Sequence, residues 1–121
     1  MTLTEFEELI ATALDGLPAQ FAKSLDNVEV LAEIWPTPEE LSAGGAGPGS
    51  TLFGLYRGIP QTKRGNYTAA VPDKIIIFAG PMLAIFGDNP EVIKEQVKKT
   101  VLHEIGHHFG MTEEQIRKAG A

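Results

Sequence analysis

The chain has 121 residues, of which 43% are hydrophobic and 21% are charged. This length suits one globular domain and is too short for two catalytic domains, so we expect residues 1–121 to form a single domain. The formal charge of −6 disfavours a phosphate backbone, and we expect no nucleic-acid partner. The absence of cysteine excludes disulfides, thiolate metal ligands and cysteine nucleophiles, so any metal must be bound by histidine and carboxylate side chains.

No segment has the pattern of a secretion signal or a membrane span. Acidic residues interrupt the apolar ones near the amino terminus, and no basic region precedes a long apolar run. The longest apolar stretch, residues 74–86, contains Gly80 and Pro81 and is too short to cross a bilayer as one helix. We therefore expect a cytoplasmic protein with no membrane partner, and no pattern indicates its oligomeric state.

Patterns in the first fifty residues predict, in order, an amphipathic helix, a short helix, a strand, one helical turn and a Gly-rich loop. These elements are expected over residues 4–16, 18–25, 27–35, 37–41 and 42–50. The first helix has Thr4 and Glu7 at the spacing of a capping box. The strand is expected to end before Pro36, because the residue before a proline disfavours helical backbone.

Patterns in the rest of the chain predict two strands followed by a long and a short helix. These elements are expected over residues 51–58, 74–78, 90–109 and 112–119. The strand at 74–78 is the most apolar and is expected at the centre of the sheet. Asn89 is expected to cap the long helix and Gly110 to end it. Thr112 and Gln115 have the spacing of a capping box for the last helix.

The long predicted helix contains the segment His103-Glu104-Ile105-Gly106-His107, in which two histidines are four residues apart. Residues at this spacing lie on one face of a helix, so both imidazoles can bind the same ion. Zinc suits such a pair and keeps positions for a third ligand and a water. The carboxylate of Glu104, beside the first histidine, can take a proton from that water. The spacing predicts a zinc site with His103 and His107 as ligands and Glu104 as the general base.

The third ligand is expected among the acidic residues that follow the helix. Gly110 can adopt the left-handed conformation that turns the chain back sharply, and this turn can bring Glu113 to the ion. We favour Glu113, although the helix dipole alone also favours a glutamate there and Glu114 has the same chemistry. His108 lies about 100° around the helix from His107, so we expect it to pack or to support the site rather than bind the ion.

The extended pattern H-E-x-x-H-x-x-G-x-x-E, from His103 to Glu113, resembles the motif of the metzincin clan. More closely, HEIGHHFG together with the upstream LFGLYRGIP resembles a family of small bacterial zincin-like metallopeptidases. The resemblance extends from Leu31 onward. It implies an α+β minimal zincin fold, in which a small mixed sheet of three to four strands packs against the long HExxH-bearing helix, with N-terminal and short C-terminal helices.

For activity, the same resemblance implies a zinc peptidase that acts on peptides or proteins. It implies one Zn²⁺ per chain, held by His103, His107 and Glu113, with Glu104 as the general base. These family roles fall on residues that the spacing also singles out.

Two other functions fit the sequence. A small domain offers little wall for a substrate cleft, so the chain can instead be a zinc-binding adaptor or regulatory domain with little or no turnover. Glu104 favours the enzyme, because a purely structural site needs a fourth ligand and no base. The polar stripe formed by Gln96, Thr100, His103 and His107 can also simply face solvent, in which case no metal binds.

Side chains outside the motif are candidates for contacts to substrate. The candidate hydrogen-bond donors to a tetrahedral intermediate are Tyr56, Arg57, Arg64 and Tyr67. The segment 51–56 is a candidate edge strand along which an extended peptide can add its own strand.

Overall fold

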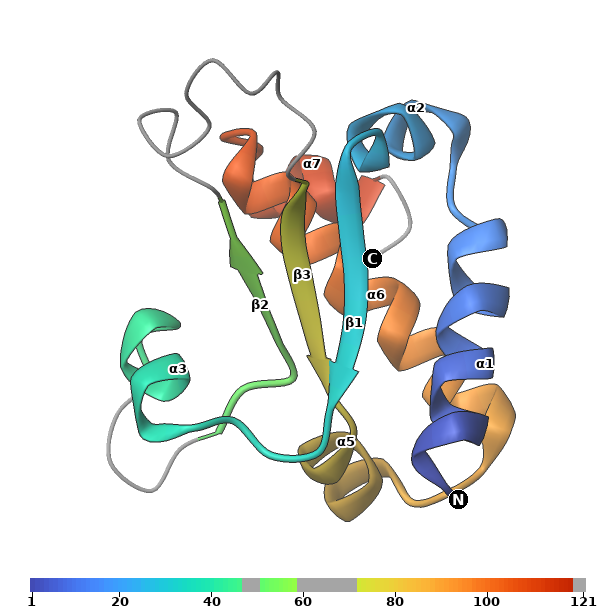
Figure 1. Cartoon of the computed structure of the whole chain (residues 1–121). Helices are drawn as coiled ribbons and strands as arrows, with labels where there is room; N and C mark the ends of the chain where they lie inside the picture. Colours follow the sequence, from blue (N-terminus) through green and yellow to red (C-terminus); the bar gives the residue numbers. More distant parts are fainter. Residues whose placement is uncertain (47–50, 59–71, 119–121) are drawn as a thin grey trace.

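The computed structural model describes residues 1–46, 51–58 and 72–118. Three strands form one mixed sheet in the order β1-β3-β2 (Figure 1). The strands are β1 (Val28–Glu33), β2 (Gly54–Arg57) and β3 (Asp73–Phe78). β1 is parallel to β3, and β2 is antiparallel to β3. The prediction that residues 74–78 form the central strand is confirmed, and β2 lies at an edge of this sheet.

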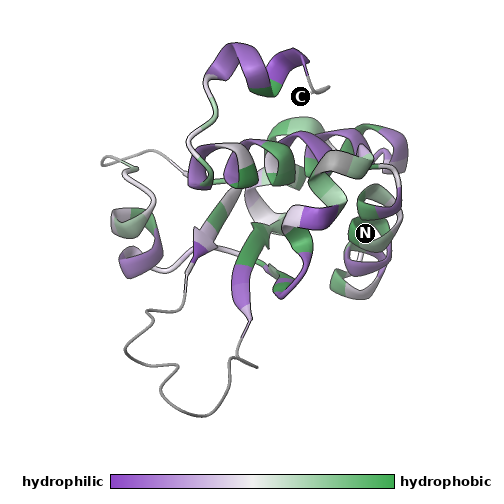
Figure 2. Ribbon diagram, turned by 90° about the horizontal axis from the view of Figure 1, so that it is seen from above, coloured by the Kyte–Doolittle hydropathy of each residue, from purple (hydrophilic) through white to green (hydrophobic). Residues whose placement is uncertain are grey.

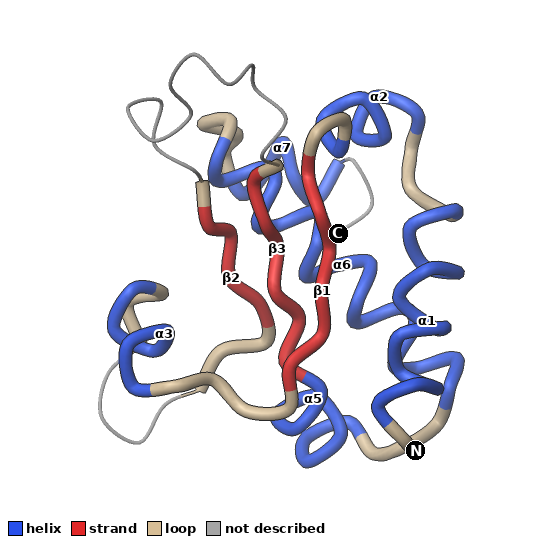
Figure 3. The backbone as a smooth tube through the Cα atoms, in the orientation of Figure 1, coloured by secondary structure: helices blue, strands red, loops and turns tan. Residues whose placement is uncertain are grey.

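Helices lie beside and behind the sheet in the view of Figures 1 and 3, with α1 and α3 on opposite sides of it. Their bounds are α1 (Leu3–Asp15), α2 (Ala19–Ala22), α3 (Pro38–Ala43), α5 (Ala79–Phe86), α6 (Pro90–His108) and α7 (Glu113–Lys118), with a 3₁₀ turn at Lys23–Leu25. The α+β class, the small mixed sheet, the long helix and the terminal helices all agree with the expected minimal zincin fold. No helix in the described ranges is long and apolar enough to cross a membrane.

The main core lies between the sheet and the helices α1 and α6. Successive residues of a strand point to opposite faces, so Ile75 and Ile77 enter this core while Ile76 and Phe78 pack with Leu55 on the other face. The residues that α6 contributes to the main core are Ile93, Val97, Val101, Leu102 and Ile105. Figure 2 shows hydrophobic residues on the strands and on both helices. Burying this stripe fixes the rotation of α6 and turns its polar side away from the core.

The caps of the helices agree with the sequence patterns in two cases and differ in one. Asn89 accepts the Glu91 N–H at 3.0 Å at the start of α6, and Thr112 caps α7 in a capping box with Gln115. The predicted pair Thr4 and Glu7 was wrong, because Thr2 and Glu5 form the capping box of α1. Both pairs have the same spacing, and the earlier one adds two residues of helix without changing which side chains enter the core.

Helix α5 was missed by the sequence analysis, which treated residues 79–86 as part of an interrupted apolar stretch. Pro81 lies in its first turn, where a backbone N–H has no partner within the helix and its absence costs nothing. Gly80 is needed there because a Cβ would lie 2.5 Å from the indole of Trp35. Because proline is tolerated in the first turn of a helix, Pro81 shortly after a strand was a signal for the start of a helix.

The loop expected over residues 42–50 begins later than predicted, because α3 continues to Ala43 and ends at Gly44. Residues 47–50 of that loop lie outside the described residues.

Candidate metal centre

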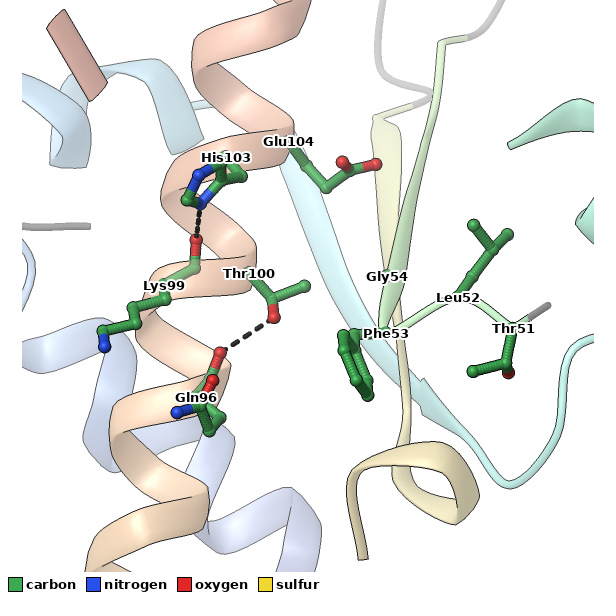
Figure 4. Close-up of a pocket in the computed structure, with 9 residues that line it drawn as sticks. All are labelled: Thr51, Leu52, Phe53, Gly54, Gln96, Lys99, Thr100, His103 and Glu104. Carbon is green, nitrogen blue, oxygen red and sulfur yellow. Dashed lines mark hydrogen bonds between the residues drawn. The ribbon is translucent and has the colours of Figure 1, made fainter. Parts of the chain in front are cut away.

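Three predicted site residues, His103, Glu104 and His107, lie on α6, which contacts the edge strand β2, and the fourth, Glu113, begins α7. A groove of about 400 Å³ lies along the contact between the two elements (Figure 4). It is lined by Thr51, Leu52, Phe53 and Gly54 from the β2 segment and by Gln96, Lys99, Thr100, His103 and Glu104 from α6. Three residues of the expected polar stripe, Gln96, Thr100 and His103, thus face this groove. The groove contains the predicted general base and one predicted ligand.

The side chains of His103, His107 and Glu113 meet at the end of α6. The Glu113 carboxylate has one oxygen 2.9 Å from His107 Nε2 and the other 3.4 Å from His103 Nε2. Within the described part of the chain, no three histidine or carboxylate side chains have the spacing of a preformed metal site. Instead, the Glu113 carboxylate is in direct contact with both imidazoles.

The histidine tautomer bears on what this cluster can hold. The Nδ1 of His103 lies 2.9 Å from the carbonyl oxygen of Lys99, a contact in which Nδ1–H is the donor. A neutral His103 then presents the lone pair of Nε2 toward the Glu113 carboxylate. Two electron-rich atoms at this distance attract each other only when a proton or a cation is shared between them. Two imidazoles and one carboxylate are a donor set that suits Zn²⁺.

Local backbone geometry brings Glu113 back to the helix that carries the histidines. Gly110 has φ +74°, and its N–H donates to the carbonyl oxygen of His107 while the Met111 N–H donates to that of Gly106. These two bonds form a Schellman motif, which reverses the chain after α6. The buried Ile116 then packs against Gly106, where a Cβ would lie 2.5 Å from Ile116 Cγ1. Helix α7 is therefore held against the end of α6.

Glu114, the alternative third ligand, points elsewhere. Its carboxylate lies 3.5 Å from the ammonium group of Lys118, and 74% of its side chain is exposed. Of the two glutamates, Glu113 is the one that contacts the histidines.

Glu104 is held by β2. Its Oε1 accepts the backbone N–H of Tyr56 at 2.9 Å, across 48 residues of sequence. Burial raises the pKa of the Glu104 carboxyl, while the Tyr56 N–H and the nearby His107 and His103 act in the opposite direction. The motif spacing could not reveal this backbone contact. The expected edge strand was the one signal in the sequence that pointed to β2.

Tyr56 and His108 form a stacked pair beside this contact. Their ring centroids are 3.9 Å apart, and the Tyr56 hydroxyl donates to Asp73 Oδ2 at 2.8 Å. His108 thus packs against β2, as expected. Arg57 is exposed, and the other two candidate donors, Arg64 and Tyr67, lie outside the described residues.

A comparison with known protein families gives a match over most of the chain. The model of the zincin-like metallopeptidase family matches residues 25–121, which include β1, β2, β3 and the helices α6 and α7. No curated protein matches the chain. Since the family match covers most of the sequence, the chain belongs to the zincin-like metallopeptidases.

Proposed function

We propose that this protein is a zinc-dependent metallopeptidase in which His103, His107 and Glu113 hold the metal and Glu104 is the general base. The observation that carries the proposal is the contact of one carboxylate, Glu113, with the Nε2 atoms of both histidines. The family to which the chain belongs supports the same chemistry.

The ligand set accounts for the choice of metal. Two neutral imidazoles and one carboxylate leave a fourth position open, which is the arrangement of catalytic rather than structural zinc sites. When bound, zinc supplies Lewis acidity and lowers the pKa of water into the neutral range.

Glu104 moves the proton in this mechanism. Its carboxylate faces the groove, takes a proton from the attacking water and delivers it to the nitrogen of the leaving amine. Burial helps this role, because it raises the pKa of the carboxyl and so makes the carboxylate a stronger base. The Tyr56 N–H keeps one carboxylate oxygen fixed, so the carboxylate need not reorient for either transfer.

The edge strand β2 supports a peptide as the substrate. The Phe78 N–H donates to the Phe53 carbonyl oxygen at 2.9 Å, so alternate residues from Phe53 onward bond to β3. The backbone groups of Gly54 therefore face the open edge, beside the groove. An extended peptide can add to such an edge as a further strand, with its scissile bond next to Glu104.

The test is the metal content of protein purified without added metal. We expect about one zinc per chain in the wild type and in the matched control Glu114→Ala, and none in His107→Ala or Glu113→Ala. No zinc in the wild type, even after zinc is added, would refute the proposal. Zinc without hydrolysis of any peptide mixture would instead support the adaptor.

A further inference from the structure

We propose that Gly54 is a positioning residue for Glu104: because it has no side chain, β2 lies directly against Thr100 of α6, and the Tyr56 N–H reaches the Glu104 carboxylate. This inference rests on the proposed function in one respect, namely that Glu104 is the general base. The contacts that carry it involve neither the metal nor a ligand.

The backbone at Gly54 is enclosed on two sides. A Cβ there would lie 2.5 Å from Thr100 Cγ2 and 3.2 Å from the carbonyl oxygen of Ile76 on the neighbouring strand. Figure 4 shows Thr100 projecting from α6 toward β2. An ordinary contact begins at 3.4 Å, so any side chain at this position must move β2 and α6 apart by about 0.9 Å.

Thr100 cannot easily turn out of the way. It is β-branched, and such side chains have few χ1 rotamers in a helix. Its hydroxyl donates to the Gln96 carbonyl oxygen at 2.8 Å, which fixes the methyl group in its present direction. The strand, rather than the side chain, must therefore move.

Tyr56 is two residues further along β2, and its N–H points to the same side as the backbone of Gly54. The bond from this N–H to Glu104 Oε1 is 2.9 Å long. A strand displacement of about 0.9 Å along this bond would lengthen it to about 3.8 Å, beyond the range of about 2.7–3.2 Å in which N–H···O bonds form. Glu104 would lose the donor that orients it, and displacements of about 1 Å from the reactive geometry cost roughly 100-fold in rate.

The experiment measures hydrogen exchange of the Tyr56 amide by NMR in ¹⁵N-labelled, metal-free protein. For Gly54→Ala we expect exchange at Tyr56 to accelerate by about tenfold or more, because the amide loses its partner. The amides of Ile75 and Ile77, which face β1, should stay protected. Glu104→Ala, which removes the acceptor, should accelerate Tyr56 in the same way.

The double variant Gly54→Ala/Thr100→Ser is the decisive test of the contact between these two residues. Serine lacks Cγ2 but keeps the hydroxyl that bonds to Gln96, so protection of Tyr56 should return to within about threefold of the wild type. Gly16→Ala is the matched control, because Gly16 has φ −90° and a Cβ there meets only ordinary contacts. It should leave the Tyr56 amide unchanged.

Three results would overturn the inference: a protected Tyr56 amide in Gly54→Ala, equal acceleration at Ile75 and Ile77, or a double variant that is not restored. If Gly54→Ala does not fold, a folded double variant with a protected Tyr56 amide supports the inference, and an unfolded one overturns it. This measurement requires neither zinc nor turnover, so its result on Gly54 can be interpreted even if the proposed function is wrong.

Discussion

Two elements flank α6 at the site, and each holds its part of the site in a different way. On one flank, α7 follows α6 after a short turn and places Glu113 against His103 and His107. On the other flank, β2 comes from 48 residues earlier in the chain and holds Glu104 through the Tyr56 N–H. The α7 side, which we call the ligand flank, depends on local backbone geometry. The β2 side, which we call the base flank, depends on packing across the whole domain.

The two flanks also differ in exposure to solvent. The side chains of His107 and Glu113 are 53% and 57% exposed, whereas Glu104 is half-buried with a raised pKa. Surface ion pairs contribute little to stability, so we expect the ligand flank to be stabilised mainly when a cation binds. The base flank is already fixed by the fold. Substitutions on the ligand flank should therefore change metal affinity, and substitutions on the base flank should change turnover.

The largest expected effect is on turnover. Glu104→Gln should lower the rate of peptide hydrolysis by about 10²–10⁴-fold, because the amide can accept the Tyr56 N–H but cannot take a proton. Zinc content, measured on the same samples, should be unchanged. His107→Ala, from the other flank, should lose both zinc and activity. Loss of zinc from Glu104→Gln would show that the base flank also determines metal binding.

The next largest effect is on zinc affinity. Alanine in a helix interior is more favourable than glycine by about 1 kcal/mol, so propensity alone predicts that Gly106→Ala is harmless or stabilising. We expect the opposite at the site, a zinc affinity lower by about tenfold, because the new Cβ meets Ile116 and moves Glu113 away from the histidines.

Competition titration with a zinc chelator measures this change. The added variant Ile116→Ala should restore part of the affinity by removing the atoms that the new Cβ meets. Unchanged affinity in Gly106→Ala would show that α7 is not held through this contact.

A smaller effect is expected on the stability of the metal-free protein. A carboxyl whose pKa is raised by folding stabilises the fold at low pH, and this stabilisation is lost as the pH rises through the raised pKa. Glu104→Gln has no such titration, so above that pH it should be more stable than the wild type. Urea unfolding between pH 4 and about pH 8 tests this. Identical pH profiles for the two proteins would contradict the assignment of a raised pKa.

The smallest effect is expected at Glu114. This side chain is largely exposed and pairs with Lys118 within one turn of helix. Glu114→Ala should change the free energy of unfolding by less than about 0.5 kcal/mol and leave zinc affinity unaltered. A loss of zinc comparable with that of Glu113→Ala would reverse our choice between the two glutamates.

Much of the ligand flank could be predicted because its determinants are close in sequence. The spacing of the histidines, the glycine at Gly110 and the cap at Thr112 each act within a few residues, and each lies where the pattern placed it. The apolar repeat of α6 and the central position of β3 were predicted for the same reason. That these residues bind zinc is still a prediction.

The base flank could not be predicted, because its contacts join residues far apart in sequence. No local pattern links Tyr56 to Glu104, or Gly54 to Thr100. Helix α5 was missed for a different reason, because Pro81 was treated as an interruption of the apolar stretch rather than as part of the first turn of a helix.

The central claim is that His103, His107 and Glu113 bind one metal ion together. A crystal structure of the zinc-loaded protein, with anomalous scattering recorded at the zinc edge, tests it most directly. We predict a single strong peak within about 2.0–2.2 Å of Nε2 of both histidines and of a Glu113 oxygen, with Glu104 not bound to it. A peak at other residues, or none at the end of α6, would contradict the account.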